Sequence, residues 1–150
     1  KNDLKYKIEG ELIHEKLQSL KWITYRSEKK PLKEISELNN VIEIIRNDKS
    51  NKALITDYQF ISVILGINDN SPSKYWYDYH VYPTEDHKLY DFYKKFFIEA
   101  LRKEKVEKIF VIKPLAGDQN IVEKIFKNKC YSKKIKTDIL DVYNIDDCLN

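Results

Sequence analysis

Hydrophobic positions along the chain alternate between short β-branched runs and longer stretches with helical spacing. From Pro31 to about residue 48, apolar residues recur every three or four positions, which predicts an amphipathic helix that begins at the proline. Four short apolar runs predict strands, namely 20–25, 52–57, 108–113 and 137–145.

Three further helices are predicted between these strands. Residues 58–66 form a short helix that ends at Gly66, and residues 121–128 form another. A long helix begins near residue 85, after a cap at Thr84. Its expected buried stripe consists of Leu89, Phe92, Tyr93, Phe96, Phe97, Ala100 and Leu101. Residues 1–19 precede the first predicted strand as a lead-in segment, which is expected to contain a helix.

Alternation of strands and helices favours right-handed crossovers between parallel strands. The sequence therefore predicts an α/β domain with three layers and a mainly parallel sheet, with helices on both faces, as in Rossmann or flavodoxin folds. Residues 1–150 are expected to form one soluble domain. The chain contains no methionine, not even at position 1, so we expect it to be a piece of a longer protein.

Composition narrows the classes of partner. A hydrophobic content of 42% argues against disorder, and a net charge of +3 gives no sign of a nucleic-acid partner. No apolar run reaches the roughly 18 residues of a membrane span. One basic cluster stands out and is interpreted as a solvated helix end, with anionic lipid or a phosphorylated ligand as the alternative. It comprises Lys127, Lys129, Lys133, Lys134 and Lys136.

Two cysteines, Cys130 and Cys148, allow one disulfide and exclude a zinc site made of cysteines alone. Cys130 follows the last predicted helix and Cys148 follows the last strand, so both are expected near one edge of the sheet. An oxidising compartment favours the bond, and a reducing one favours two thiols.

Ligands of parallel α/β sheets bind at the carboxyl ends of the strands. This rule selects Asp57, Tyr58 and Gln59 after the second strand, Lys113 after the third, and the following turn at 117–119. Asp57 is also a good helix cap, and Lys113 is also a plausible solvated strand end. The chain lacks glycine-rich phosphate loops, so no cofactor is expected.

The segment SPSKYWYDYHVYP, residues 71–83, is the densest aromatic stretch. Alternation along an extended segment predicts that one set of rings caps the core beside the long helix, while the other forms a ligand surface suited to sugar rings. Trp76, Asp78 and His80 are the candidates for ligand contacts. Asp78, His80 and His87 match no known metal-site spacing, so neither a metal site nor a catalytic residue is assigned.

Several segments resemble the soluble C-terminal portion of bacterial membrane glycosyltransferase-like proteins, distant relatives of the dolichyl-phosphate-mannose protein mannosyltransferases. They are LKWITY, ALITDYQFISVILGI, SPSKYWYDYHVYP, FYKKFFIEALRKEKVEKIFVIKPL and ILDVYNI, which together span most of 17–145.

The resemblance implies a non-catalytic accessory domain on the periplasmic face of the inner membrane. Its partners are then the membrane portion of the same polypeptide and a glycan or lipid-linked acceptor. No residue matches the catalytic acids of that family, so the isolated domain is expected neither to transfer sugar nor to hydrolyse nucleotides. The alternatives are a free-standing cytosolic α/β enzyme or small-molecule binding module, and a purely structural assembly domain.

Overall fold

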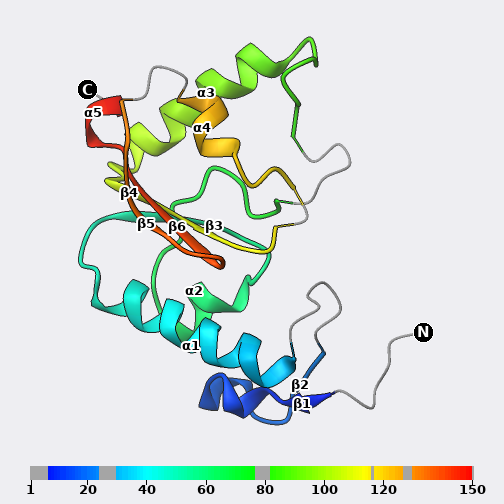
Figure 1. The fold of residues 1–150 in the computed structure, drawn as a ribbon. Helices are drawn as coiled ribbons and strands as arrows, with labels where there is room; N and C mark the ends of the chain where they lie inside the picture. Colours follow the sequence, from blue (N-terminus) through cyan, green and yellow to red (C-terminus); the bar gives the residue numbers. More distant parts are fainter. Residues whose placement is uncertain (1–6, 24–29, 77–81, 116, 127–129, 150) are drawn as a thin grey trace.

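The computed structural model describes residues 7–23, 30–76, 82–115, 117–126 and 130–149 (Figure 1). A four-stranded sheet has the order β3-β4-β6-β5, and a two-stranded sheet pairs β1 with β2. The strands are β1 (Ile8–Glu9), β2 (Lys21–Trp22), β3 (Lys52–Thr56), β4 (Lys108–Ile112), β5 (Ser132–Lys136) and β6 (Leu140–Asn144). The helices are α1 (Pro31–Asn47), α2 (Phe60–Leu65), α3 (Tyr90–Lys103), α4 (Ile121–Ile125) and α5 (Asp146–Leu149).

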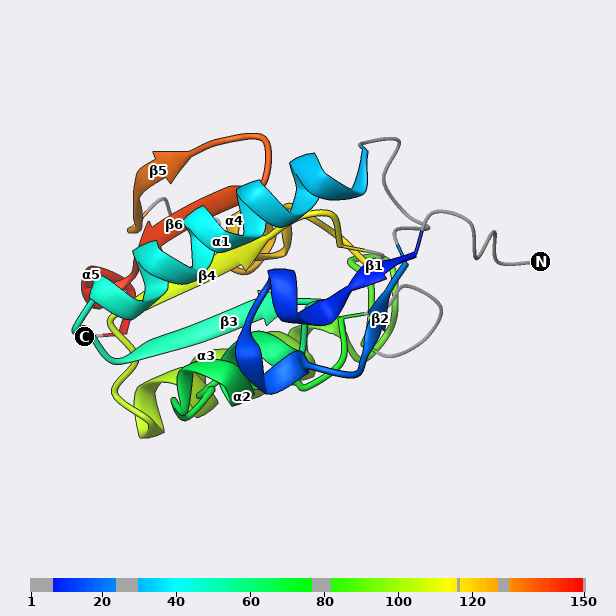
Figure 2. The same ribbon diagram turned by 90° about the horizontal axis from the view of Figure 1, so that it is seen from below.

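Helices cover both faces of the larger sheet. In Figure 1, α3 and α4 lie above the sheet, and α1 and α2 lie below it. Figure 2 shows α1 crossing the lower face of β4 and β6. Side chains of one strand alternate between the two cores: Leu54 packs toward α1 and α2, and Ile55 packs toward α3 and α4. The central positions of β3, 53–55, and positions 109–112 of β4 are therefore apolar.

The predicted helix at Pro31 and the predicted strands at 52–57 and 108–113 are confirmed. Pro31 occupies the first turn of α1, and the predicted apolar face is buried except at Leu32, which is 66% exposed. Gly66 ends α2 with φ of +63°, a conformation that favours glycine.

The prediction of a three-layer, mainly parallel Rossmann- or flavodoxin-like sheet is wrong. Strands β3 and β4 are parallel, but β6 is antiparallel to both of its neighbours, β4 and β5. Only α1 and α3, among the described helices, contain seven residues or more. The alternation of strands and helices ends at α4, because the chain then forms a hairpin instead of another crossover.

The hairpin arises from a strand in the basic cluster, which the sequence analysis interpreted as a solvated helix end. Ser132–Lys136 alternates between exposed and partly buried positions, and it pairs with β6 as the edge strand β5. Thr137 closes the turn, since its backbone N–H donates to the Leu140 carbonyl at 2.8 Å and its Oγ1 accepts from the Leu140 N–H at 2.9 Å. Such a short connection permits only antiparallel pairing.

The N-terminal part also differs from the prediction. In the described part of the run 20–25, residues 20–23, only Lys21–Trp22 forms a strand, and it pairs with Ile8–Glu9 outside the main sheet. The expected lead-in helix is replaced by two 3-10 turns, Gly10–Leu12 and Glu15–Leu17. A two-residue strand is long enough to pair locally but too short to add a strand to the larger sheet.

Helix α3 begins at Tyr90, five residues after the predicted start. Its buried side is narrower than predicted: Phe97 and Leu101 are fully buried, but Leu89, Phe92 and Phe96 are 50%, 73% and 47% exposed. In the ranges that the structure describes, no helix combines the length and apolar character needed to cross a lipid bilayer.

A polar junction joins the end of α1 to the start of the sheet. Asp48 Oδ2 lies 2.5 Å from Lys108 Nζ, and Asp48 Oδ1 accepts from the Ser50 N–H at 2.9 Å. Burial by itself raises the pKa of the Asp48 carboxyl, but the hydrogen bonds from Lys108 and Ser50 outweigh it and hold this pKa at about 2. Lys52 Nζ meanwhile donates to the Ile45 carbonyl at 3.2 Å, at the C-terminus of α1.

We predict that Asp48→Asn makes the free energy of unfolding less dependent on pH in the acidic range. Because the folded-state pKa is lowered, the Asp48 interactions stabilise the fold above about pH 4 and are lost as the pH falls through about 2. At pH 6 the free energy of unfolding of the wild type should exceed that of Asp48→Asn by about 2 kcal/mol, and at pH 2 this difference should be mostly absent. Urea unfolding at both pH values measures it. Glu43→Gln, in an exposed pair with Arg46, is the control; an undiminished advantage at pH 2 contradicts the assignment.

Candidate functional site

A cavity of about 330 Å³ lies where α3 begins and where the loop after β4 enters α4. It follows the carboxyl end of β4, a strand of the parallel pair, which is the position expected for a ligand site in an α/β sheet. The α3 side contributes three tyrosines, Tyr82, Tyr90 and Tyr93, and one carboxylate, Glu85. The α4 side contributes Asp118 and Lys124.

The wall of the cavity depends on a close approach at Gly117. A Cβ atom at this position would lie 2.2 Å from the Trp76 carbonyl oxygen and 2.6 Å from Tyr82 Oη. Only glycine leaves room for this contact. The next backbone N–H, of Asp118, donates to Tyr82 Oη at 2.8 Å. The loop after β4 is therefore held directly against the segment that precedes α3.

Trp76 supports this wall from inside the core. Its side chain is 1% exposed, and its ring centroid lies 6.0 Å from that of Tyr82 and 6.0 Å from that of Phe97. Trp76 therefore caps the core beside α3, as predicted for one set of rings. Phe92 and Phe96, which were predicted with Phe97 as part of the buried stripe of this helix, are largely outside the core.

Tyr93 supplies the polar group of the cavity that the protein leaves unused. Its ring stacks on Tyr82 at 5.8 Å with an interplanar angle of 18°. Its hydroxyl is buried and has no hydrogen-bond partner among the described residues. Burial, reinforced by the nearby Tyr82 and Tyr90 hydroxyls, raises the pKa of Tyr93, so the group stays neutral and can both donate and accept. A buried hydroxyl without a partner is costly unless a ligand or water satisfies it.

The charged rim of the cavity has two carboxylates and one ammonium. Lys124 Nζ lies 2.6 Å from Asp118 Oδ2 and 3.5 Å from Glu85 Oε2. The hydrogen bond from Lys124 to Asp118 raises the pKa of the lysine, so Lys124 keeps its charge. Two acidic side chains and one basic side chain give the rim a formal charge of −1. All three side chains are more than a quarter exposed, so these pairs add little stability.

The candidates at the end of β3 lie outside this cavity. Asp57 is partly exposed, and Gln59 is exposed and donates from Nε2 to the Thr56 carbonyl at 2.6 Å. Tyr58 is buried, and its hydroxyl donates to Glu34 Oε1 at 2.8 Å. These contacts stabilise the turn between β3 and α2.

Lys113 contributes elsewhere, His87 Nδ1 accepts from the Leu89 N–H at 3.2 Å, and two further candidates cannot be placed. Lys113 Nζ lies 3.5 Å from Asp141 Oδ2 and donates to the Thr137 carbonyl at 2.8 Å, so it braces the β5–β6 hairpin. Asp78 and His80 lie outside the described residues, as do Tyr77 and Tyr79. In the described ranges, no group of three or more histidine, cysteine or acidic side chains is arranged to hold a metal ion.

The basic cluster at 127–136 is partly neutralised. Lys133 Nζ lies 3.1 Å from both Glu123 Oε1 and Asp141 Oδ2. This lysine is therefore committed to contacts within the protein. Lys127 and Lys129 lie outside the described residues, and the other two lysines are exposed on β5.

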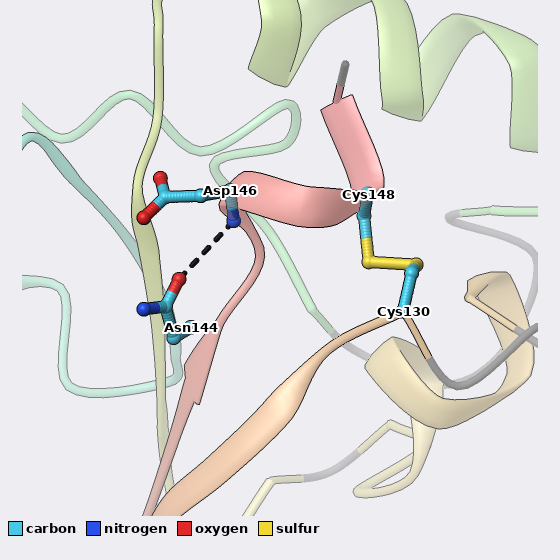
Figure 3. The surroundings of a disulfide bond; sticks show 4 residues. All are labelled: Cys130, Asn144, Asp146 and Cys148. Carbon is cyan, nitrogen blue, oxygen red and sulfur yellow. Dashed lines mark hydrogen bonds between the residues drawn. A yellow bond between two sulfur atoms is a disulfide. The ribbon is translucent and has the colours of Figure 1, made fainter.

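Cys130 and Cys148 form a disulfide, so the alternative of two free thiols does not apply to this structure (Figure 3). The bond joins Cys130, two residues before β5, to the short helix α5. Figure 3 also shows the Asn144 side chain accepting from the Asp146 N–H, at 3.1 Å, where α5 begins. The disulfide and this cap together fix the C-terminus against the edge of the sheet.

No protein-family model, curated protein or solved structure matches the chain. The resemblance to membrane glycosyltransferase-like proteins therefore stays a prediction that rests on the quoted sequence segments.

The sequence analysis selected one side of this cavity and missed the other. Gly117 and Asp118 were selected by the rule for strand ends. Tyr93 was assigned to the buried stripe of α3, and Tyr90, Glu85 and Lys124 were not singled out as ligand residues. The available signal was the spacing of Tyr90 and Tyr93, which places two hydroxyls on one side of the first turn of α3.

Replacing Trp76 by Ala should lower the free energy of unfolding by about 3–5 kcal/mol, because it removes a fully buried indole. The neighbouring Tyr75 is 62% exposed, so Tyr75→Ala is a matched control with an expected change below about 0.5 kcal/mol. Urea unfolding measures both variants. Equal stabilities for Trp76→Ala and wild type contradict the core-cap role.

The paired change Cys130→Ser and Cys148→Ser should lower stability by about 3 kcal/mol, because it releases a closed loop with a sequence separation of 18. Unfolding by urea, with and without reductant, compares the variant with wild type. Wild type with reductant should match the variant. A difference below about 0.5 kcal/mol between oxidised wild type and the variant contradicts a stabilising role.

Proposed function

We propose that the chain is a non-catalytic recognition domain that binds a neutral, hydroxyl-rich ring, such as one sugar unit, in the cavity beside Tyr93. The observation that carries this proposal is Tyr93, a residue that lines the cavity and whose buried hydroxyl has no hydrogen-bond partner among the described residues. A ligand hydroxyl can supply the missing partner.

The size of the cavity favours a ligand of one ring. Its volume of about 330 Å³ is close to the lower end of the range for small-molecule pockets, which runs from about 300 to 1,000 Å³. A nucleotide or an extended oligosaccharide would have to leave most of its atoms in solvent. A single ring can instead place its hydroxyls on Tyr93 and on the carboxylates of Glu85 and Asp118.

The charge of the cavity favours neutral ligands over anions. Glu85 and Asp118 exceed Lys124 by one negative charge, and Lys124 is already paired with both. A phosphate group would meet a carboxylate rim and no uncommitted ammonium in this set of residues. Carboxylates, by contrast, are strong acceptors for the hydroxyl groups of sugars.

The proposed setting is an accessory domain of a polyprenyl-phosphate-sugar-dependent membrane glycosyltransferase, on the periplasmic face of the bacterial inner membrane. The sequence segments quoted above support this setting. The disulfide between Cys130 and Cys148 supports an oxidising compartment and disfavours the cytosolic alternative. In this setting the cavity contributes to recognition of a glycan acceptor, beside the membrane portion of the same polypeptide.

The proposal predicts that Tyr93→Phe weakens sugar binding while leaving the fold intact. Loss of one hydroxyl hydrogen bond corresponds to a roughly 2- to 10-fold increase in Kd. Tyr75→Phe makes the same chemical change at an exposed tyrosine outside the cavity and should leave Kd unchanged. Titration calorimetry with methyl glycosides of mannose, glucose, galactose and N-acetylglucosamine measures binding, and thermal unfolding checks the fold.

Sugar phosphates provide the second arm of this experiment. Mannose 6-phosphate should bind more weakly than methyl mannoside, and Glu85→Gln should reduce that difference by removing one rim charge. Failure of every glycoside to bind, or equal affinities of Tyr93→Phe and wild type, contradicts the proposed site.

A further inference from the structure

Three apolar side chains form a line on the outer side of α3. Leu89, Phe92 and Phe96 are 50%, 73% and 47% exposed, and their spacing of three and four residues places them along one face. We call these three residues the α3 stripe. The opposite face of the helix carries Phe97 and Leu101, which are fully buried. The stripe is therefore not needed to hold α3 on the sheet.

Exposed lysines border the α3 stripe. Lys88 and Lys95 lie one turn from Phe92, and Lys103 continues the line beyond Phe96. Within the described ranges, none of these three lysines forms an ion pair. Glu99 also borders the stripe, and the exposed Asp91 lies one turn from Lys88 and Lys95, so these five side chains have a net charge of +1.

We infer that the α3 stripe docks on a lipid surface that carries anionic head groups. A helix that combines exposed phenylalanines with neighbouring lysines has the character of an interfacial membrane contact, because the rings enter the acyl boundary while the ammonium groups remain at the phosphates. Helix α3, which carries Phe92 and Phe96, lies in the outer layer of the molecule, on the side of the sheet away from α1 and α2 (Figure 1).

The shape of this surface favours a lipid phase over a protein groove. The stripe residues are side chains projecting from a helix, and the cavity beside α3 is lined by other residues of that helix, Tyr90 and Tyr93. A fluid bilayer accommodates such projecting rings without a preformed complementary groove. The neighbouring lysines match the negative charge of phospholipid head groups and add a salt-dependent attraction.

Docking by this surface would also orient the cavity. The Tyr93 ring lies 6.4 Å from Phe96 on one side and 5.8 Å from Tyr82 on the other. The cavity residues are therefore adjacent to the α3 stripe, and a ligand would be recognised next to the bilayer. The lipid contact itself does not depend on sugar binding, so either can fail alone.

Vesicle co-sedimentation of the 150-residue chain tests the inference. Vesicles of phosphatidylcholine with about one quarter phosphatidylglycerol should bind the wild type, and vesicles of phosphatidylcholine alone should bind it much more weakly. The paired change Phe92→Ser and Phe96→Ser should weaken partitioning at least about tenfold, since each inserted ring removes apolar area from water. Raising the salt concentration should also weaken it.

Val63→Ser is the matched control. Val63 is 69% exposed on α2, on the other side of the sheet, so its loss should leave vesicle binding unchanged. If the double serine variant does not fold, replacing Lys88, Lys95 and Lys103 by Gln supplies an independent test and should abolish the preference for anionic vesicles.

Three results would overturn the lipid assignment. The first is failure of the wild type to bind anionic vesicles, and the second is equal binding by the folded serine variant. The third is a wild-type dimer in light scattering that the serine variant dissociates, which would assign the stripe to a second copy of the chain.

Discussion

The contact between Gly117 and Trp76 is the constraint on which the candidate site depends. A Cβ atom added to Gly117 would lie only 2.2 Å from the Trp76 carbonyl oxygen, so no larger residue fits at this position in the loop after β4. Trp76 is itself buried against Phe97 of α3. One contact therefore links the interior packing of α3 to the backbone that forms the cavity wall. Tyr82, whose hydroxyl accepts from the Asp118 N–H, is held in the same arrangement.

Local patterns predicted the elements of the central sheet but not their complete arrangement. Strands β3 and β4 are continuous apolar runs because both of their faces are buried, and α1 has a proline start and a regular apolar face. Strand β5 was missed because lysines occupy most of its positions, and its strand signal is an alternation of exposure that becomes clear only when β6 pairs with it. The direction of β6 depends on the short turn at Thr137. The alternation of strands and helices, from which a parallel sheet was predicted, contains no information about this turn.

The candidate site was predictable where a topological rule applied and not where tertiary packing decides. The end of β4 and the turn at Gly117 follow from the rule for parallel strands, which still holds because β3 and β4 are parallel. The role of Tyr93 depends on which side of α3 faces the core. Two adjacent sides of this helix are aromatic, and the sequence does not reveal that Phe92 is exposed while Phe97 is buried. Likewise, Tyr58 is held by Glu34, a partner 24 positions away in the chain.

The central claim is that a cavity held in place by Gly117 and Trp76 presents the Tyr93 hydroxyl to a neutral ring ligand. An NMR titration of the isotopically labelled chain with methyl mannoside and the other methyl glycosides tests it most directly. The account predicts saturable chemical-shift changes that cluster at Tyr82, Tyr93, Gly117 and the rim of the cavity for at least one glycoside. Saturable changes confined to another surface, or none with any glycoside, would contradict it.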